Sequence, residues 1–100
     1  MRIAGTSRLI RAAMGCSAET CGAYRAFHAE LIAASWQSPQ DALSAYPNAE
    51  LEAHRLVVPL DERHCVVVAI NYQLEIALIE HAGLRSDRTR KSSLVVREHP

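Results

Sequence analysis

The strongest hydrophobic pattern in the chain lies in residues 64–79. Residues 64–71 are mostly apolar and β-branched over the length of a strand, and residues 76–79 form a second apolar run. The polar break between the two runs is typical of a tight reversal. The pattern therefore predicts an antiparallel hairpin at the centre of a sheet, against which the N-terminal part of the chain packs.

The predicted hairpin sets a register for its two histidines. If residue 72 faces residue 75 across a two-residue turn, residue 66 faces residue 81. His64 and His81 are then diagonal neighbours on one face, at the end of the hairpin away from its turn. Functional residues are therefore expected at this end of the hairpin.

Three amphipathic segments precede the hairpin. Ser7 is placed to start a first helix that ends near Gly15, and Ser17 is placed to start a second. Ser38, followed by Pro39, predicts the start of a third. The second segment has apolar residues at three- and four-residue steps, which predict one buried face: Tyr24, Phe27, Leu31, Ile32 and Trp36.

Strands are expected before and after these helices in the chain. Residues 1–5 suit a short edge strand, and residues 55–60 form a strand in which Pro59 indicates an edge or a bulge. Gly83 closes the last predicted strand, and residues 84–100 form a divergent basic tail compatible with a strand, a helix or disorder. The order predicts one α+β domain over residues 1–100, an antiparallel sheet with N-terminal helices packed on one face.

Charge is balanced over the whole chain but not along it. The 100 residues contain 11 basic and 11 acidic side chains. The charged residues of 16–62 are mostly acidic, whereas those at both ends of the chain are mostly basic. The domain is therefore not basic as a whole, as many nucleic-acid-binding domains are, but a local cationic patch is compatible with its sequence. No apolar run approaches the roughly 18 residues of a membrane span, and the N-terminus lacks a signal-peptide pattern, which favours a cytoplasmic protein.

The three cysteines are expected to be reduced. Cys16, Cys21 and Cys65 are an odd number in a chain without an export signal. The spacing of Cys16, Cys21 and His28 matches no zinc motif and lacks a fourth ligand. We therefore expect structural cysteines, no metal and no cofactor.

Several short motifs occur in a characteristic order. They are Met1-Arg-Ile, Trp36-Gln-Ser-Pro39 with Asp41, Tyr46-Pro-Asn-Ala49, Val66-Val-Val-Ala-Ile-Asn-Tyr72 and Gly83. In this order and spacing they resemble the HigB family of bacterial toxins, within the RelE-like group. The resemblance implies a small RelE-like fold and an mRNA interferase, a metal-independent endoribonuclease that cuts messenger RNA, generally on the ribosome. It also implies a HigA-like helix-turn-helix antitoxin as partner.

The positions expected to carry catalysis depart from the family pattern. The family usually has Tyr-Arg where this chain has His64 and Cys65, and Thr-His-x-x-Tyr-Asp after the glycine, where residues 84–89 read Leu-Arg-Ser-Asp-Arg-Thr. No catalytic residue is therefore transferred by identity. Two alternatives to an active nuclease stay open: an inactive remnant that still binds RNA or antitoxin, and an interaction domain with an unrelated partner.

The side chains that are present still supply the groups that RNA cleavage needs: a base for the 2′-hydroxyl, a cation for the phosphorane and an acid for the leaving oxygen. His64 and His81 are candidates for proton transfer, because imidazole titrates near neutral pH. Arg85 and Arg88 are candidates for phosphate binding, and Asp87 for orienting a histidine. Further RNA contacts are expected from basic residues at the sheet edge and in the tail: Arg55, Arg63, Arg90 and Lys91.

One further expectation concerns this basic region. An antitoxin should shield the positive end of the domain, where Arg63, Arg85 and Arg88 gather. The competing interpretations are a strand histidine without a catalytic role and a tail that is only a solvated charge run.

Overall fold

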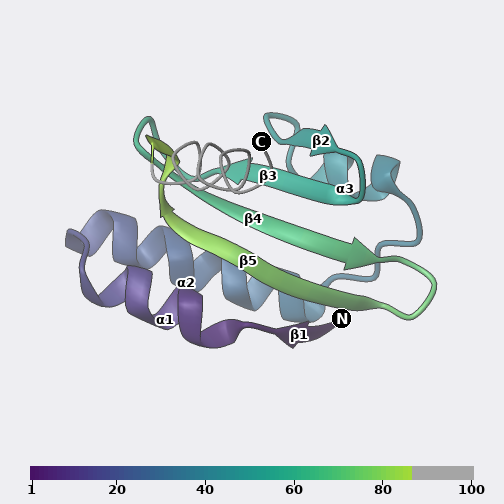
Figure 1. Ribbon diagram of the computed structural model, residues 1–100, viewed down its shortest axis with the longest axis horizontal. Helices are drawn as coiled ribbons and strands as arrows, with labels where there is room; N and C mark the ends of the chain where they lie inside the picture. Colours follow the sequence, from purple (N-terminus) through teal and green to yellow (C-terminus); the bar gives the residue numbers. More distant parts are fainter. Residues whose placement is uncertain (87–100) are drawn as a thin grey trace, which may run out of the picture.

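The computed structural model describes residues 1–86, which form five strands and three helices (Figure 1). In chain order they are β1 (Arg2–Ala4), α1 (Thr6–Met14), α2 (Ala18–Ala33), α3 (Pro39–Ala45), β2 (Glu50–Glu52), β3 (Arg55–Pro59), β4 (His64–Asn71) and β5 (Ile76–Leu84). The strand order in the sheet is β1-β5-β4-β3-β2. Neighbouring strands are antiparallel except β1 and β5, which are parallel. The predicted α+β fold is confirmed, and its topology is consistent with the RelE-like group.

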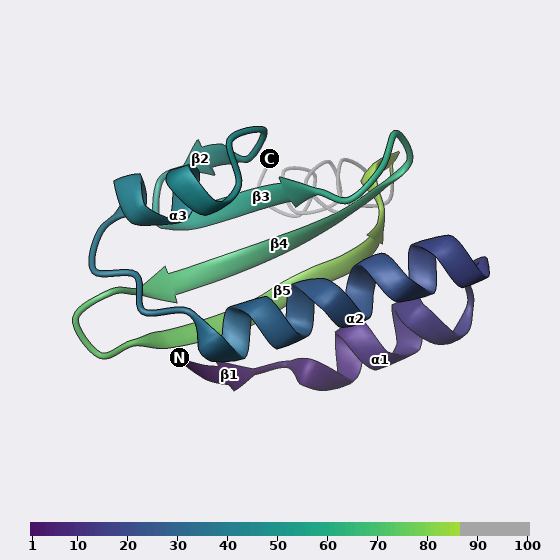
Figure 2. The ribbon, with the colours of Figure 1, turned by 180° about the vertical axis from the view of Figure 1, so that it is seen from behind.

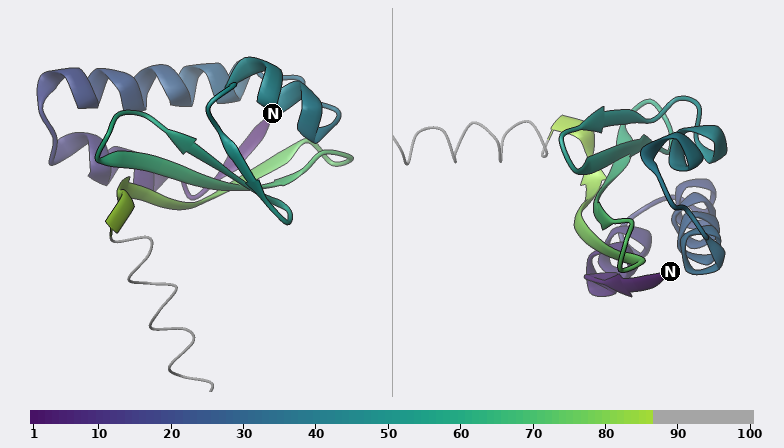
Figure 3. Two further views of the ribbon diagram at one scale, coloured as in Figure 1. Left: turned by 90° about the horizontal axis from the view of Figure 1, so that it is seen from above. Right: turned by 90° about the vertical axis from the view of Figure 1, so that its right-hand side faces the viewer.

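The helices pack on one face of the sheet. Figure 2 shows them in front of the strands, and Figure 3 shows α2 lying along the length of the sheet. The core between the two layers is formed by apolar side chains of the helices, β3, β4 and β5, among them Phe27, Leu31, Val58, Val66, Val68 and Ile79. None of the helices within residues 1–86 covers the opposite face.

Two serines begin helices as predicted. The Ser17 hydroxyl accepts a hydrogen bond from the Thr20 N–H at 3.4 Å, at the start of α2. The Ser38 hydroxyl accepts one from the Asp41 N–H at 3.4 Å, at the start of α3, whose first residue is Pro39. Each hydroxyl satisfies a backbone N–H that has no partner inside its helix.

The start of α1 differs from the prediction. The helix begins at Thr6 after Gly5, and no side chain caps it. Gly5 has φ of 80°, and a Cβ at this position would lie 2.5 Å from the Ile79 carbonyl oxygen on β5. Only glycine therefore allows α1 to begin this close to the sheet.

The buried face of α2 is shorter than its apolar pattern. Tyr24, Phe27 and Leu31 are buried, but Ile32 is 53% exposed, so its predicted burial is wrong. One residue beyond Leu31 is a turn of about 100° around the helix, which points Ile32 away from the sheet. The helix ends at Ala33, and Trp36 reaches the core from the following segment, where it packs edge-on against Tyr46 with ring centroids 6.0 Å apart.

The β4–β5 hairpin keeps the predicted register only near its turn. Asn71 pairs with Ile76, and Asn71 Oδ1 accepts a hydrogen bond from the Leu74 N–H at 3.0 Å within the connecting loop. Further along, Val68 pairs with Ile79 but Val67 pairs with His81, so Glu80 is the extra residue of a β-bulge. The predicted pairing of residues 66 and 81 is therefore wrong by one position.

The bulge places the two histidines on opposite faces of the sheet. His64 has the same strand parity as Val66 and Val68, which belong to the core beneath the helices. His81 faces Val67, which forms a separate small cluster with Val57 and Cys65 on the other side. We call this other side the outer face; it carries Arg55, Val57, Cys65, Val67, Ala69, Glu80 and His81.

Candidate functional site

Both predicted histidines lie at the same end of the β4–β5 hairpin, away from its turn. His64 is the first residue of β4 and pairs with Leu84, the last residue of β5. His81 lies close by on β5, so the predicted shared end is confirmed, while the shared face is not. We call this end the open end; it comprises residues 61–64 and 84–86.

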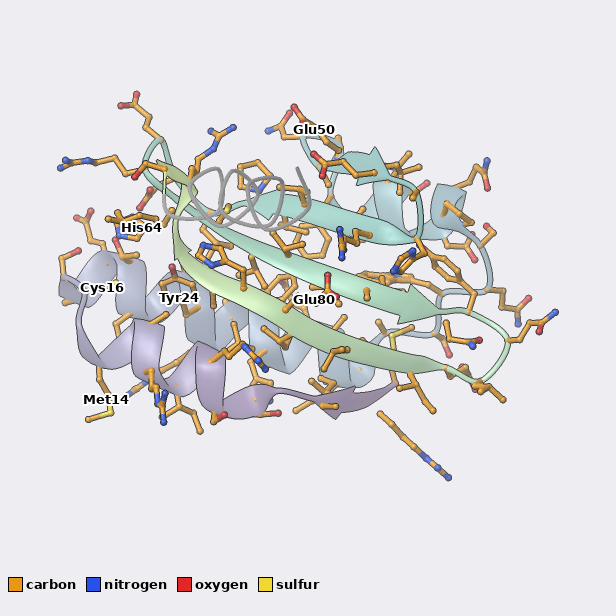
Figure 4. All side chains as sticks on the ribbon, in the orientation of Figure 1. Met14, Cys16, Tyr24, Glu50, His64 and Glu80 are labelled. Atoms are coloured by element: carbon orange, nitrogen blue, oxygen red, sulfur yellow. The ribbon has the colours of Figure 1, made fainter. Side chains whose placement is uncertain are left out.

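On the helix-covered face, His64 is held by Asp61. Its Nδ1 lies 2.9 Å from Asp61 Oδ1 and 3.1 Å from Oδ2. An ionised carboxylate only accepts hydrogen bonds, so Nδ1 carries a proton and donates it. The imidazole also lies edge-on to Tyr24, with ring centroids 6.2 Å apart (Figure 4).

Asp61 connects the β3–β4 loop to the start of α2. Its Oδ1 accepts hydrogen bonds from the backbone N–H groups of Arg63 and His64, both at 2.8 Å, and its Oδ2 accepts one from the Thr20 hydroxyl at 3.2 Å. Burial acts to raise the pKa of Asp61, but the His64 ring and the two backbone N–H groups outweigh it and hold this pKa at about 2. Asp61 is therefore ionised at neutral pH and fixes the orientation of His64.

The contacts of Asp61 should make stability sensitive to acid. The folded-state pKa of about 2 lies below the ordinary value of 3.8, so the stabilisation is present above the ordinary pKa and is lost as the pH falls through the folded one. Asp61→Asn should lower the free energy of unfolding at pH 7 by at most ~1 kcal/mol, because solvent screens this exposed carboxylate. In urea titrations the difference from the wild type should shrink towards pH 2; a constant difference would contradict the assignment.

A thiol and a phenol lie beside this pair without forming a nucleophile. Cys16 Sγ donates a hydrogen bond to the Ala12 carbonyl oxygen at 2.9 Å, and burial together with Asp61 and Cys21 raises the pKa of the thiol. A raised pKa disfavours the thiolate that nucleophilic catalysis requires. The buried Tyr24 hydroxyl has no hydrogen-bond partner among the described residues, and burial raises its pKa as well. This face therefore presents an oriented imidazole but no activated nucleophile.

On the outer face, His81 is oriented by the end of its own strand. Its Nε2 lies 3.0 Å from the Leu84 carbonyl oxygen, and since a carbonyl only accepts, Nε2 carries a proton. The ring lies beside Gly83, whose φ of 152° is rare for residues that have a Cβ. Nδ1 is then the atom that can accept a proton from a substrate, or donate one when the ring is protonated.

Arg55 and Glu80 form an ion pair that spans three strands of the outer face. The Arg55 Nε donates to Glu80 Oε1 at 2.5 Å, although the two residues lie on β3 and β5. Between them β4 presents Ala69, the register partner of Arg55, whose small side chain leaves room for the arginine to cross. Figure 4 shows Glu80 on the side of the sheet that faces the viewer. The bulge thus brings Glu80 and His81 to the same face as Arg55.

Arg55 adds less to the long-range attraction of RNA than the sequence suggested. Glu80 neutralises its charge, and two glutamates of β2 lie on the same face of the sheet. At the open end, the Arg85 N–H donates to the Arg63 carbonyl oxygen at 2.9 Å, so these two residues are neighbours. Attraction for an RNA backbone is therefore expected at the open end rather than over Arg55.

The structure thus divides the predicted site residues into groups. His81 and Arg55 share the outer face, Arg63 and Arg85 meet at the open end, and His64 lies on the helix-covered face. Four predicted residues lie outside the described part of the chain: Asp87, Arg88, Arg90 and Lys91.

Glu80 is the residue that sequence reasoning missed. Its signal is the polar pair Glu80-His81 inside an otherwise apolar strand. Regular alternation would direct one of the two polar side chains into the core, which is unfavourable, and an extra residue in the strand turns both outward.

Comparison with known proteins adds no further residue assignments. A scan against protein-family models found no match, and a search of curated proteins found no significant similarity. Within residues 1–86, no helix is long and apolar enough to cross a membrane, and no group of three or more His, Cys, Asp or Glu side chains is placed to hold a metal ion. All three cysteines are thiols.

Proposed function

We propose that this protein is a toxin of the HigB type, an mRNA interferase that cuts messenger RNA on the ribosome in the cytoplasm. A HigA-like helix-turn-helix antitoxin silences it. Two observations support the proposal. The motifs around Trp36, Tyr46 and residues 66–72 have the order and spacing of that family, and the strands and helices have a RelE-like arrangement. Because one fold can host many activities, the choice of a nuclease depends on the site itself.

The observation that carries the proposal is the group of three side chains on the outer face. Cleavage through the 2′-hydroxyl needs a proton acceptor, a cation beside the phosphorane and a proton donor. Glu80, Arg55 and His81 are chemically suited to these three roles, and they lie on one face of the sheet. Within residues 1–86 no helix packs against these three side chains, whereas His64 packs against Tyr24 of α2.

In the proposed reaction, Glu80 accepts the proton of the 2′-hydroxyl as the 2′-oxygen attacks the phosphorus. The Arg55 guanidinium stabilises the charge that develops on the phosphorane oxygens. Protonated His81 donates a proton to the 5′-oxygen as the bond between phosphorus and that oxygen breaks. The products are a 2′,3′-cyclic phosphate and a 5′-hydroxyl end, and every proton is accounted for by these side chains.

Affinity for the RNA backbone comes from the open end. Arg63 and Arg85 are neighbours there, and the sequence continues with Arg88, Arg90 and Lys91. Contacts of this kind position a nucleic acid strand without reading its sequence. The antitoxin covers Arg63, Arg85 and Arg88, because opposite charge on the partner would speed association and keep RNA away.

A second candidate is a remnant of the family that binds RNA or antitoxin without cutting RNA. It is favoured by the different residues at positions 64–65 and 84–89, where the family usually has its catalytic groups. Binding needs only the fold and the cations of the open end. Cleavage also needs the three outer-face side chains to meet the scissile phosphate together.

Induced expression in a bacterial host distinguishes these candidates. We expect the wild type to arrest growth, a neighbouring helix-turn-helix gene to relieve the arrest, and Arg85→Ala to weaken it through the loss of a phosphate contact. An inactive remnant would leave growth unchanged but would still bind the helix-turn-helix protein. A chain that neither arrests growth nor binds that protein would contradict both candidates.

A further inference from the structure

A groove between α1 and α2 has no role in the proposed function. It has a volume of about 340 Å³ and is lined only by these two helices. Leu9 of α1 and Tyr24 of α2 are buried and form its floor. Figure 2 shows the two helices side by side on the helical side of the molecule. The groove is therefore separate from the outer face, and the inference drawn from it does not depend on RNA cleavage.

Two large apolar side chains stand exposed at this groove. Ile10 is 55% exposed and Met14 is 82% exposed. They are one helical turn apart, so they lie on the same side of α1. Adjacent apolar side chains with this exposure, above an apolar floor, are typical of a surface that another molecule covers.

The charge around the groove is positive. Arg25 and His28 of α2 line it, and within residues 1–86 Arg25 has no carboxylate partner. Helix α1 carries no acidic residue that would offset this charge. A partner with carboxylates beside its apolar contacts would therefore complement this surface.

We propose that the groove is a docking site for an amphipathic helix of a partner protein, with apolar anchors flanked by acidic residues. Residues that line the groove recur one turn apart on each helix, as Ile10 and Met14 do on α1 and Tyr24 and His28 do on α2. Anchors spaced by three or four residues on a partner helix match this repeat. Carboxylates next to these anchors meet Arg25.

Other occupants fit the observations less well. A small molecule seated on Leu9 and Tyr24 would leave most of Met14 exposed. A membrane surface would bury Ile10 and Met14 but would leave the apolar floor, which lies below them, uncovered. An RNA strand requires exposed aromatic side chains or a row of cations, and the groove offers one buried tyrosine and one arginine.

Binding of two designed peptides to the full chain tests the proposal. Both are labelled helical peptides with leucines at positions i, i+4 and i+7; one carries glutamates beside them and the other carries lysines. We expect fluorescence anisotropy to show binding of the acidic peptide at micromolar concentration, weakened at least tenfold by Met14→Glu. Arg25→Glu should reverse the preference in favour of the basic peptide. Leu74→Glu is the control, because Leu74 is 65% exposed in the β4–β5 loop and does not line the groove.

Four results would overturn the proposal. They are no binding of the acidic peptide at 1 mM, equal binding of both peptides, equal weakening by Met14→Glu and Leu74→Glu, and no change of preference in Arg25→Glu. Vesicles containing phosphatidylglycerol and a single-stranded RNA are tested in parallel. Binding to either probe that Met14→Glu abolishes would assign the groove to a membrane or to RNA instead.

Discussion

Replacing His81 with asparagine should reduce the rate of RNA cleavage by about 10²–10⁴-fold, the usual contribution of a positioned proton donor. The imidazole lies on the outer face beside Glu80, and its Nε2 is fixed by the Leu84 carbonyl oxygen. Asparagine keeps a polar side chain at this half-buried position but cannot transfer a proton. The measurement is the rate of cleavage of an end-labelled messenger RNA, free and bound to ribosomes.

His64→Asn is the matched control for this variant. His64 lies at the same end of the hairpin but on the opposite face, where it contacts Asp61 and Tyr24. We expect its cleavage rate to stay close to that of the wild type, while its unfolding midpoint in urea falls because Asp61 loses a hydrogen-bond partner. If His64→Asn loses as much activity as His81→Asn, the outer-face assignment is wrong.

Trp36→Ala should lower the free energy of unfolding by about 3–5 kcal/mol. Trp36 is 8% exposed and packs edge-on against Tyr46, which in turn contacts Phe27. Truncation removes a large apolar surface and leaves a cavity beside Tyr46. For a domain of this size the loss is a large share of its total stability, so partial unfolding at 37 °C is expected. Urea denaturation followed by circular dichroism measures it.

Ile32→Ala is the control for Trp36→Ala, because it removes an apolar side chain that is not packed in the core. Both residues belong to the same apolar pattern in the sequence, but Ile32 is 53% exposed. We expect this variant to lose less than about 1 kcal/mol, because it leaves no cavity. A cost below about 1 kcal/mol for Trp36→Ala would show that the aromatic cluster around Tyr46 is not part of the core.

The helices and the central hairpin could be predicted because local chemistry decides them. Ser17 and Ser38 each precede a helix-forming segment, and a serine at that position caps the helix. The β-branched run before Asn71 favours a buried strand. Trp36 was predicted to be buried as part of α2, yet the helix ends earlier and the ring returns to the core through a loop. Its burial follows from size and hydrophobicity, whereas its path depends on tertiary packing.

Which residues share the candidate site depends on the β-bulge in β5, and almost nothing in the local sequence predicts this bulge. One extra residue at Glu80 shifts the pairing of β5 and moves His81 from the face of His64 to the outer face. The short strand β2 was also not predicted, because Glu50-Leu51-Glu52 alternates over too few residues to be distinguished from a loop. Arg55 was identified, but its pairing with Glu80 was not, because the two residues meet only across an intervening strand.

The chemistry of the RNA ends tests the proposed nuclease most directly. The full chain is incubated with messenger RNA and ribosomes from a nuclease-deficient host, with His81→Asn as the matched control, and the new ends are identified by kinase labelling and mass spectrometry. The proposed reaction predicts 5′-hydroxyl and 2′,3′-cyclic phosphate ends from the wild type, and a loss of at least about 100-fold in His81→Asn. New ends that carry a 5′-phosphate and a 3′-hydroxyl, or an RNA that stays intact with the wild type, would contradict it.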